Sequence, residues 1–322
     1  RLLDAFGERR APWALVVIGT LVGIPLFFDV GFIVLAPLVI TLALRAKRRV
    51  MYFALPLLSG LLTMHALLPP HPGPVAVAEL IGTDYGLLAI YGLACGIPAA
   101  IIAGPVFAKL AHGQSGFGEG GPPPRFDEKA PTLAPIGFVP ALAGMMIPLS
   151  LILLAALAGS MLLEGPLRTF LEFIGHPFTA LIIACAFVGL WLRLRLDAPL
   201  QTVSDVMTRA LAPAGLMVLV VGAGAAYKEV LIQSGAGAQV TAAVSAFNLA
   251  VPVFAFLLAA FVRIAQGSAT VAMVTAAGLA APLIAQAGLS PGQIALVTVS
   301  IGAGASVASH VNDTGFWLVK QY

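Results

Sequence analysis

The sequence predicts an all-α polytopic membrane protein, and three observations support this fold class. Hydrophobic residues make up 60% of the 322 residues, charged residues only 10%, and the mean hydropathy is +1.00. Soluble domains carry about 25% charged residues, so this chain has too few charges to cover a surface in water. Its apolar segments lack the alternating pattern of a membrane barrel, and helices then satisfy the backbone in lipid.

Ten apolar segments are predicted as helices, because a helix that spans a bilayer needs roughly 20 mostly apolar residues. They lie at about 12–28, 30–44, 50–68, 85–108, 136–160, 177–192, 211–226, 241–262, 268–286 and 291–308. Polar, Gly and Pro residues interrupt several of them, as in GIPLFFDVGF (23–32), PPHPGP (69–74) and VRIAQGSAT (262–270). At membrane depth such interruptions occur only where they pack in protein or line a cavity. The sequence therefore predicts discontinuous helices and re-entrant hairpins.

The basic residues predict the orientation in the membrane. If 12–44 enters and returns as a hairpin and 50–82 crosses once, nearly all Lys and Arg up to Arg209 share one side. The positive-inside rule makes that side cytoplasmic, as expected of a multi-pass membrane protein. The net charge of +3 is explained by this asymmetry, and no nucleic-acid partner is expected.

A Gly/Pro-rich stretch divides the chain. Residues 109–135 are predicted to form a flexible cytoplasmic linker between a first membrane half, 1–108, and a second, 136–322. The opening RLLDAFGERR has no apolar core and is not a signal peptide, so we expect further sequence upstream of Arg1.

A faint internal repeat relates the two halves at a constant offset. The interruption at Asp29 then matches QGSAT (266–270), and the interruption at His71 matches SHVND (309–313). Two interruptions in the same order and at similar spacing are typical of transporters built from inverted repeats.

SHVNDTGF (309–316) is predicted to be the unwound centre of a helix. Asn312, Asp313 and Thr314 prefer helix caps to helix interiors, and a broken helix presents backbone donors and acceptors to a small solute. The alternative is a polar loop at the membrane surface.

The stretch QGSAT (266–270) is the second candidate site. Gly267 suits a tight hairpin tip close to a ligand, and the two parallel N–H donors of Arg263 can bind a carboxylate. Alternatively, Arg263 snorkels to the interface and QGSAT is a helix-packing surface.

Other ionisable residues lie within apolar sequence. Asp29 is predicted to be a buried carboxylate that binds a proton, or else a structural partner of Arg263 or Lys228. His71 is predicted to lie at a broken-helix tip, where it donates to an anion or relays a proton, or simply caps local carbonyls. His65 is a second candidate in the same proline-rich stretch.

No motif indicates an enzyme or a cofactor. The sequence contains neither a recognisable nucleophile–base pair nor a metal motif such as HExxH, and the six-residue spacing of His65 and His71 is not a metal signature. Cys95 and Cys185 lie in apolar runs and are predicted to be buried free thiols.

Five stretches together resemble the gluconate permease family: GIPLFFDVGF, HALLPPHPGP, VGAGAAYKEVLIQSG, RIAQGSATVAM and SHVNDTGFWLVKQY. The resemblance covers essentially the whole chain, although family members often have Glu where this chain has Asp29. It implies a proton-coupled symporter for gluconate or a related sugar acid, a homodimer, and hairpins that enter the membrane without crossing. It also implies further membrane segments upstream and a short tail downstream.

The resemblance and the broken helices together suggest which residues serve transport. Sugar-acid hydroxyls and carboxylate are expected to bind His71, Arg263, Gln266, Ser268, Thr270, Asn312 and Thr314. Asp29 or Asp313 is expected to carry the coupled proton, with His65, Lys228 and His310 as secondary candidates. The alternatives are a permease for another hydroxylated solute such as D-serine or an organic acid, coupling to sodium, and a passive channel.

Overall fold

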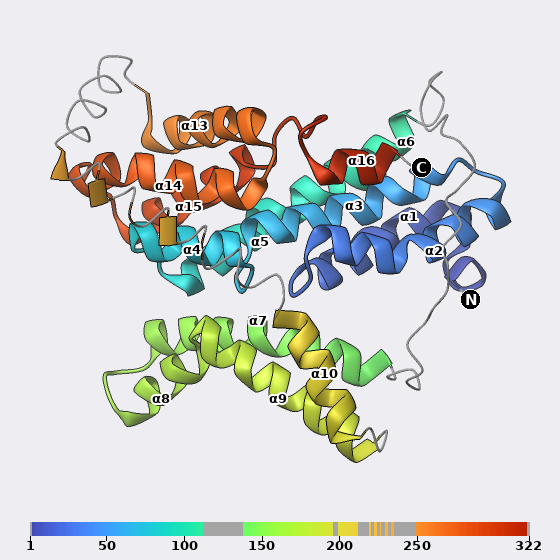
Figure 1. The fold of residues 1–322 in the computed structure, drawn as a ribbon, viewed down its shortest axis with the longest axis horizontal. Helices are drawn as coiled ribbons and strands as arrows, with labels where there is room; N and C mark the ends of the chain where they lie inside the picture. The colour runs from blue at the N-terminus through green and yellow to red at the C-terminus, as the bar shows by residue number, and fades with distance from the viewer. Residues whose placement is uncertain are drawn as a thin grey trace.

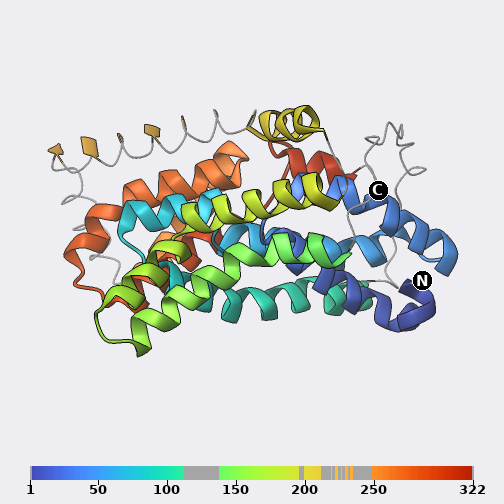
Figure 2. The same ribbon diagram turned by 90° about the horizontal axis from the view of Figure 1, so that it is seen from below.

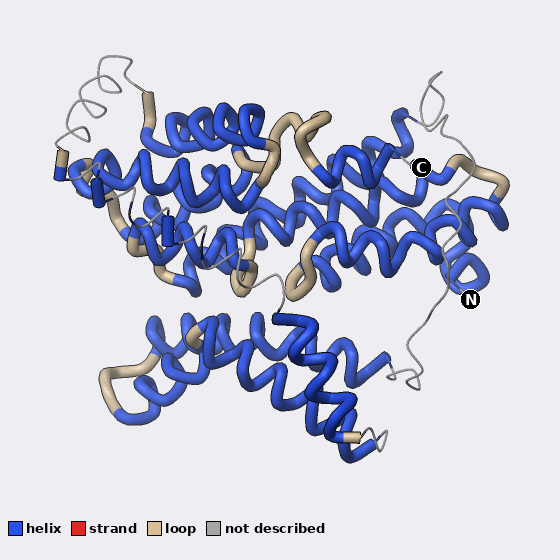
Figure 3. The backbone as a smooth tube through the Cα atoms, in the orientation of Figure 1, coloured by secondary structure: helices blue, strands red, loops and turns tan. Residues whose placement is uncertain are grey.

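The computed structural model describes residues 2–111, 138–195, 199–211 and 249–320, together with a few single residues between 219 and 234. All secondary structure in these ranges is helical (Figures 1 and 3). The helices are α1 (Leu2–Gly23), α2 (Phe28–Ala46), α3 (Val50–Leu67), α4 (Pro72–Ile81), α5 (Tyr85–Ile101), a π-helical turn (Ile102–Val106), α6 (Phe107–Ala111), α7 (Phe138–Met161), α8 (Pro166–Gly175), α9 (Pro177–Arg195), α10 (Leu200–Leu211), α13 (Val251–Gln266), α14 (Ala269–Gln286), α15 (Pro291–Gly304) and α16 (Thr314–Lys320).

Within the described part of the chain, six helical segments are long and apolar enough to cross a membrane. They are Phe28–Ala46, Val50–Ile81, Tyr85–Ala111, Val139–Gly159, Pro177–Arg195 and Ala269–Gln286, and three shorter apolar helices accompany them. The expected all-α polytopic membrane fold is therefore confirmed. The predicted segment 211–226 and the first part of 241–262 lie largely outside the described residues.

Two of the predicted interruptions are real breaks between helices. The segment Val50–Ile81 is divided into α3 and α4 by the prolines at 69 and 70, and Pro72 opens α4 at a position where no N–H is needed. The second break follows α15, where residues 305–313 leave the helix before α16 begins at Thr314. Each break thus interrupts an otherwise apolar helical segment.

Two helical hairpins precede these broken helices. Residues 24–27 join α1 to α2, and Gly267 and Ser268 join α13 to α14. The spacing of the helix starts is regular. α2 begins at Phe28 and α14 at Ala269, while α3 begins at Val50 and α15 at Pro291. The same number of residues separates the two starts in each pair. The repeat of hairpin and broken helix is therefore present in the fold.

The two repeats pack reciprocally. α4, which follows the first break, packs on α14 of the second hairpin, and α16, which follows the second break, packs on α2 of the first hairpin. The C-terminal ends of α3 and α15 also meet, with Gly302 against the carbonyl of Ala66. In Figure 1, α1–α3 lie on the right and α13–α15 on the left, so both hairpin tips and both breaks meet near the centre.

Helices α7–α10 form a separate layer, seen below the others in Figure 1 and in front of them in Figure 2. α7 reaches the remaining helices mainly through α5, whereas α14 and α15 pack on α4 and α5. The short helix α8 links the apolar helices α7 and α9, and its Arg168 pairs with Glu172 at 2.7 Å.

One expectation needs correction. Cys95 on α5 and Cys185 on α9 are free, as predicted, but both are exposed, because they lie on helix faces that no described element covers. The predicted linker at 109–135 lies largely outside the described part of the chain, since α6 ends at Ala111 and residues 112–137 are not described.

Candidate functional site

The tip of the second hairpin touches the second helix break. Gly267 ends α13 with φ of 86°, a left-handed conformation that glycine adopts without strain. A Cβ atom at Gly267 would collide with the backbone carbonyl of Asn312. Ser268 then caps α14, with its Oγ accepting a hydrogen bond from Val271 N at 3.4 Å. QGSAT and SHVND, which are well separated in the sequence, are therefore in direct contact.

Arg263, one turn before this tip, is the buried cation of the site. Its side chain is only 4% exposed, and Nη2 forms an ion pair with Oδ2 of Asp313. Ser309 Oγ donates to the same Oδ2, and Gly315 N donates to Oδ1 at 3.1 Å. Within the described part of the chain, Nε and Nη1 of Arg263 are buried without a hydrogen-bond partner. The guanidinium therefore has free donors for an additional acceptor.

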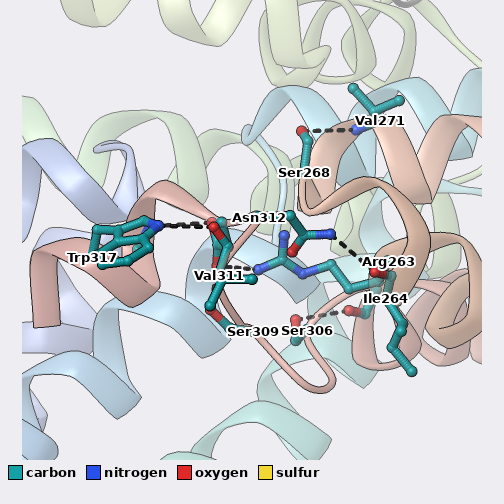
Figure 4. A network of polar contacts seen from close by, with 12 residues as sticks. Arg263, Ile264, Ser268, Val271, Ser306, Ser309, Val311, Asn312 and Trp317 are labelled. Atoms are coloured by element: carbon teal, nitrogen blue, oxygen red, sulfur yellow. Dashed lines mark hydrogen bonds and ion pairs between the residues drawn. The ribbon is translucent and has the colours of Figure 1, made fainter. Parts of the chain in front are cut away.

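The loop of the second break is held in place by hydrogen bonds to both sides. Asn312 Nδ2 donates to the carbonyl of Ile264 in α13 at 2.9 Å, and Trp317 Nε1 donates to the carbonyl of Val311 at 2.8 Å (Figure 4). The first bond ties the loop to the hairpin, and the second ties it to α16. The unwound segment is thus positioned by specific contacts on both sides.

The first break and the first hairpin form a matching contact. His71 Nε2 lies 3.1 Å from the carbonyl of Leu26 at the hairpin tip and 3.0 Å from His65 Nδ1. The ring of Phe27 packs edge-on against His71 at a centroid distance of 5.1 Å. Both histidines are buried, and Nδ1 of His71 has no hydrogen-bond partner.

The two halves of the site adjoin each other. A Cβ at Gly73, in the first turn of α4, would touch the side chain of Met273 and lie 3.9 Å from the Cα of Thr270, in the first turn of α14. Arg263 is close enough to His65 for an electrostatic interaction. The N-termini of α4 and α14 therefore meet beside a buried guanidinium, and helix N-termini and cations both favour an anion.

The remaining predicted residues are distributed around this centre. Thr270 is buried, while Gln266, Ser268 and Asn312 are exposed. His310 has a buried Nδ1 without a partner, and Thr314 begins α16. Lys228 lies outside the described residues.

Asp29 differs from its expected setting. It lies in the first turn of α2 and is exposed, because the preceding hairpin tip leaves its side chain uncovered. It is close enough to His71 for an electrostatic interaction, but the partner of Arg263 is Asp313. The pairing of Asp29 with Arg263 is therefore wrong.

Three contributors were missed in the sequence. Ser309 supplies a donor to Asp313, and the carbonyls of Leu26 and Ile264 accept hydrogen bonds from the breaks. Ser309 belongs to the quoted SHVND run and could have been chosen, whereas a backbone carbonyl carries no sequence signal. In the described ranges, no group of three or more His, Cys, Asp or Glu side chains is arranged to hold a metal ion.

Comparison with known proteins places the chain. It is 36% identical to the high-affinity gluconate transporter of Escherichia coli K12, a match that covers 100% of this chain and 72% of the relative. It is 37% identical to a gluconate permease of Pseudomonas aeruginosa and 35% identical to the Gnt-II system L-idonate transporter of Escherichia coli K12, over 100% of this chain and 71% and 72% of those proteins. No solved structure matches the chain significantly. The GntP family permease model matches residues 1–322, and the chain belongs to this family of permeases.

Proposed function

We propose that the protein carries gluconate or a closely related sugar acid across the bacterial inner membrane by proton symport. The observation that carries the proposal is the buried guanidinium of Arg263, whose Nε and Nη1 have no hydrogen-bond partner among the described residues and lie beside a hairpin tip and a helix break. A buried donor without a partner is costly unless an acceptor fills the site. Related proteins are named for gluconate and L-idonate, both carboxylates with many hydroxyl groups.

The binding mode follows from the types of side chain around this centre. The substrate carboxylate binds Arg263, because a guanidinium offers parallel N–H donors that match two carboxylate oxygens. The sugar hydroxyls bind the polar groups of the hairpin tip and the breaks, namely His71, Gln266, Ser268, Thr270, Asn312 and Thr314. These groups replace the water that the substrate loses on entering the membrane.

Coupling to protons requires a group that gains and loses a charge. Asp29 and Asp313 are the carboxylates nearest the site, and either one would carry the proton inward with the substrate. Access would alternate as the hairpins move against the rest of the protein, which we propose to be a homodimer with its two membrane halves joined by a cytoplasmic linker.

Uptake of radiolabelled gluconate by proteoliposomes tests this function. With an acidic outside solution, we expect accumulation above equilibrium that a protonophore abolishes and excess L-idonate reduces. Preloaded unlabelled gluconate should drive counterflow of label, which a passive channel cannot support. Absence of both accumulation and counterflow in correctly folded protein would contradict the proposal. Uptake driven by a sodium gradient instead of a proton gradient would show that sodium is the coupling ion.

A further inference from the structure

The charge balance around Arg263 restricts how an anion can enter the site. Among the described residues, the ion pair at this site contributes one buried positive charge, on Arg263, and one negative charge, on Asp313, in direct contact. Asp29 is exposed, so its charge does not belong to this buried pair. A sugar acid at neutral pH brings one further negative charge. An excess charge in a buried site is strongly unfavourable, so the anion must arrive together with one positive charge.

Among the residues that the structure describes, only a few groups near Arg263 can take up that charge. Asp313 touches the guanidinium directly; His65 lies within electrostatic range, and His71 contacts His65. A proton on His65 or His71 would place a second positive charge near Arg263, where Coulomb repulsion opposes it. His310 and Asp29 have no described contact with the guanidinium. Protonation of Asp313 removes the charge that competes with the substrate for Arg263.

We propose that the substrate carboxylate occupies the free donors of Arg263 and that one proton from the external solution binds a carboxylate oxygen of Asp313. This inference rests on the proposed function and assigns its coupling step. The empty site, with the Arg263–Asp313 ion pair, is neutral; the loaded site, with protonated Asp313, is neutral as well. The site with substrate but without the proton carries a net negative charge, so one proton accompanies each sugar acid.

The neighbours of Asp313 suit both states. In the empty site, Oδ2 accepts from Arg263 and Ser309, and Oδ1 accepts from the backbone N–H of Gly315. After protonation, Oδ1 keeps its acceptor role toward Gly315, and the Ser309 hydroxyl can rotate to accept the new O–H. The carboxyl group can therefore become neutral without leaving its place at the start of α16.

Calorimetry of the purified full chain tests the assignment. Titration with gluconate in two buffers of different ionisation enthalpy measures the protons bound per substrate. For the wild-type protein we expect about one proton, with an apparent affinity that falls about tenfold for each unit rise in pH where the proton is taken up. For Asp313→Asn we expect gluconate binding without proton uptake and an affinity independent of pH.

A matched control is available outside the site. Glu172→Gln removes the carboxylate of another arginine pair, Arg168–Glu172 on α8, and should retain an uptake of one proton. Unchanged proton uptake in Asp313→Asn would overturn the inference. Loss of proton uptake in Asp29→Asn would show that Asp29, and not Asp313, binds the coupled proton.

A second measurement avoids reliance on a variant that fails to fold. Infrared difference spectra of the wild-type protein should gain a protonated carboxyl band when gluconate is added. Absence of this band despite saturating gluconate would also overturn the assignment. Failure of the wild-type protein to bind gluconate at all would instead contradict the proposed function itself.

Discussion

At the residue scale, the hairpin tip depends on a glycine for two separate reasons. Gly267 adopts φ of 86°, which an L-residue avoids at a cost of about 1–2 kcal/mol. Its missing side chain also leaves room for the carbonyl of Asn312. The first requirement concerns local stability, and the second concerns the approach of the hairpin to the helix break.

Replacement of Gly267 by alanine separates these effects when it is compared with Gly82→Ala. Gly82 ends α4 with φ of 74°, but a Cβ there would meet nothing within 4 Å. We expect both variants to lose stability in thermal unfolding because of the positive φ, and Gly267→Ala to lose more, because its methyl group also collides with the backbone of Asn312. Only Gly267→Ala should also lose most gluconate uptake, because its methyl group pushes the tip away from the loop at 305–313.

Equal uptake by these two variants would show that close contact between Gly267 and Asn312 is not needed for transport. Purified protein should be compared at equal amounts in the membrane, so that reduced expression is not mistaken for reduced transport.

At the element scale, each helix break contacts its own hairpin through a polar side chain that lies against a backbone carbonyl. His71 of the first break faces the carbonyl of Leu26, and Asn312 of the second break donates to the carbonyl of Ile264. The offset between His71 and Asn312 is the same one that relates the hairpins and the broken helices. The repeat therefore includes the polar side chain with which each helix break contacts its hairpin.

Hydrogen exchange should reveal two independent contacts. His71→Ala is expected to speed exchange around residues 24–31 and leave residues 267–272 unchanged, while Asn312→Ala should do the reverse. A typical hydrogen bond contributes about 0.5–1.5 kcal/mol, so the exchange rate should rise by a factor between about 2 and 13. Asn312→Ala should also weaken gluconate binding, because the displaced loop carries part of the site.

Trp317→Phe is a suitable control for Asn312→Ala. It removes the hydrogen bond to Val311 in the same loop but leaves the bond to Ile264 in α13. Faster exchange at the hairpin tip in Trp317→Phe as well would mean that the loop as a whole, and not Asn312, holds the hairpin.

At the scale of the whole molecule, the two repeats are interleaved. α4 packs on α14, α16 packs on α2, and the hydroxyls of Thr83 and Thr298 lie 2.6 Å apart in a buried contact between the end of α4 and α15. These contacts join segments from opposite ends of the chain. One apolar core combines α4 of the first repeat with α13, α14 and α15 of the second, whereas the core of α1, α2 and α3 is formed by the first repeat.

A disulfide between positions 83 and 298 tests this packing. Thr83→Cys with Thr298→Cys, made after Cys95 and Cys185 are replaced by serine, should cross-link readily on mild oxidation, because the two hydroxyl oxygens are near a sulfur–sulfur distance. Thr83→Cys with Ser290→Cys should not, since Ser290 lies at the far end of α15, about 12 Å farther along the helix axis. Mass spectrometry of the cross-linked peptides measures both, and equal yields would contradict the interleaved fold.

Much of this organisation can be predicted from local sequence. The prolines at 69, 70 and 72 and the run SHVND mark both breaks, because Pro lacks an N–H and Asn and Asp favour helix ends. Gly267 and Ser268 mark the second hairpin tip for similar reasons. The partner of Arg263 was not predictable in this way: Asp313 belongs to a different, later segment of the chain, and Asp29 fitted the same chemistry.

Composition and helix-breaking residues were thus sufficient for the membrane class, for the long apolar helices in the described part of the chain and for the two helix breaks, since these depend on neighbours along the chain and on the solvent. They did not predict the shorter helices α4, α8, α10 and α16. The path of the chain between distant segments decides three other features. These are the pairing of breaks with hairpins, the carboxylate that neutralises Arg263, and the faces of α5 and α9 that stay uncovered. Those choices are made by packing in three dimensions, where contact energy depends on distance in space and not on separation in sequence.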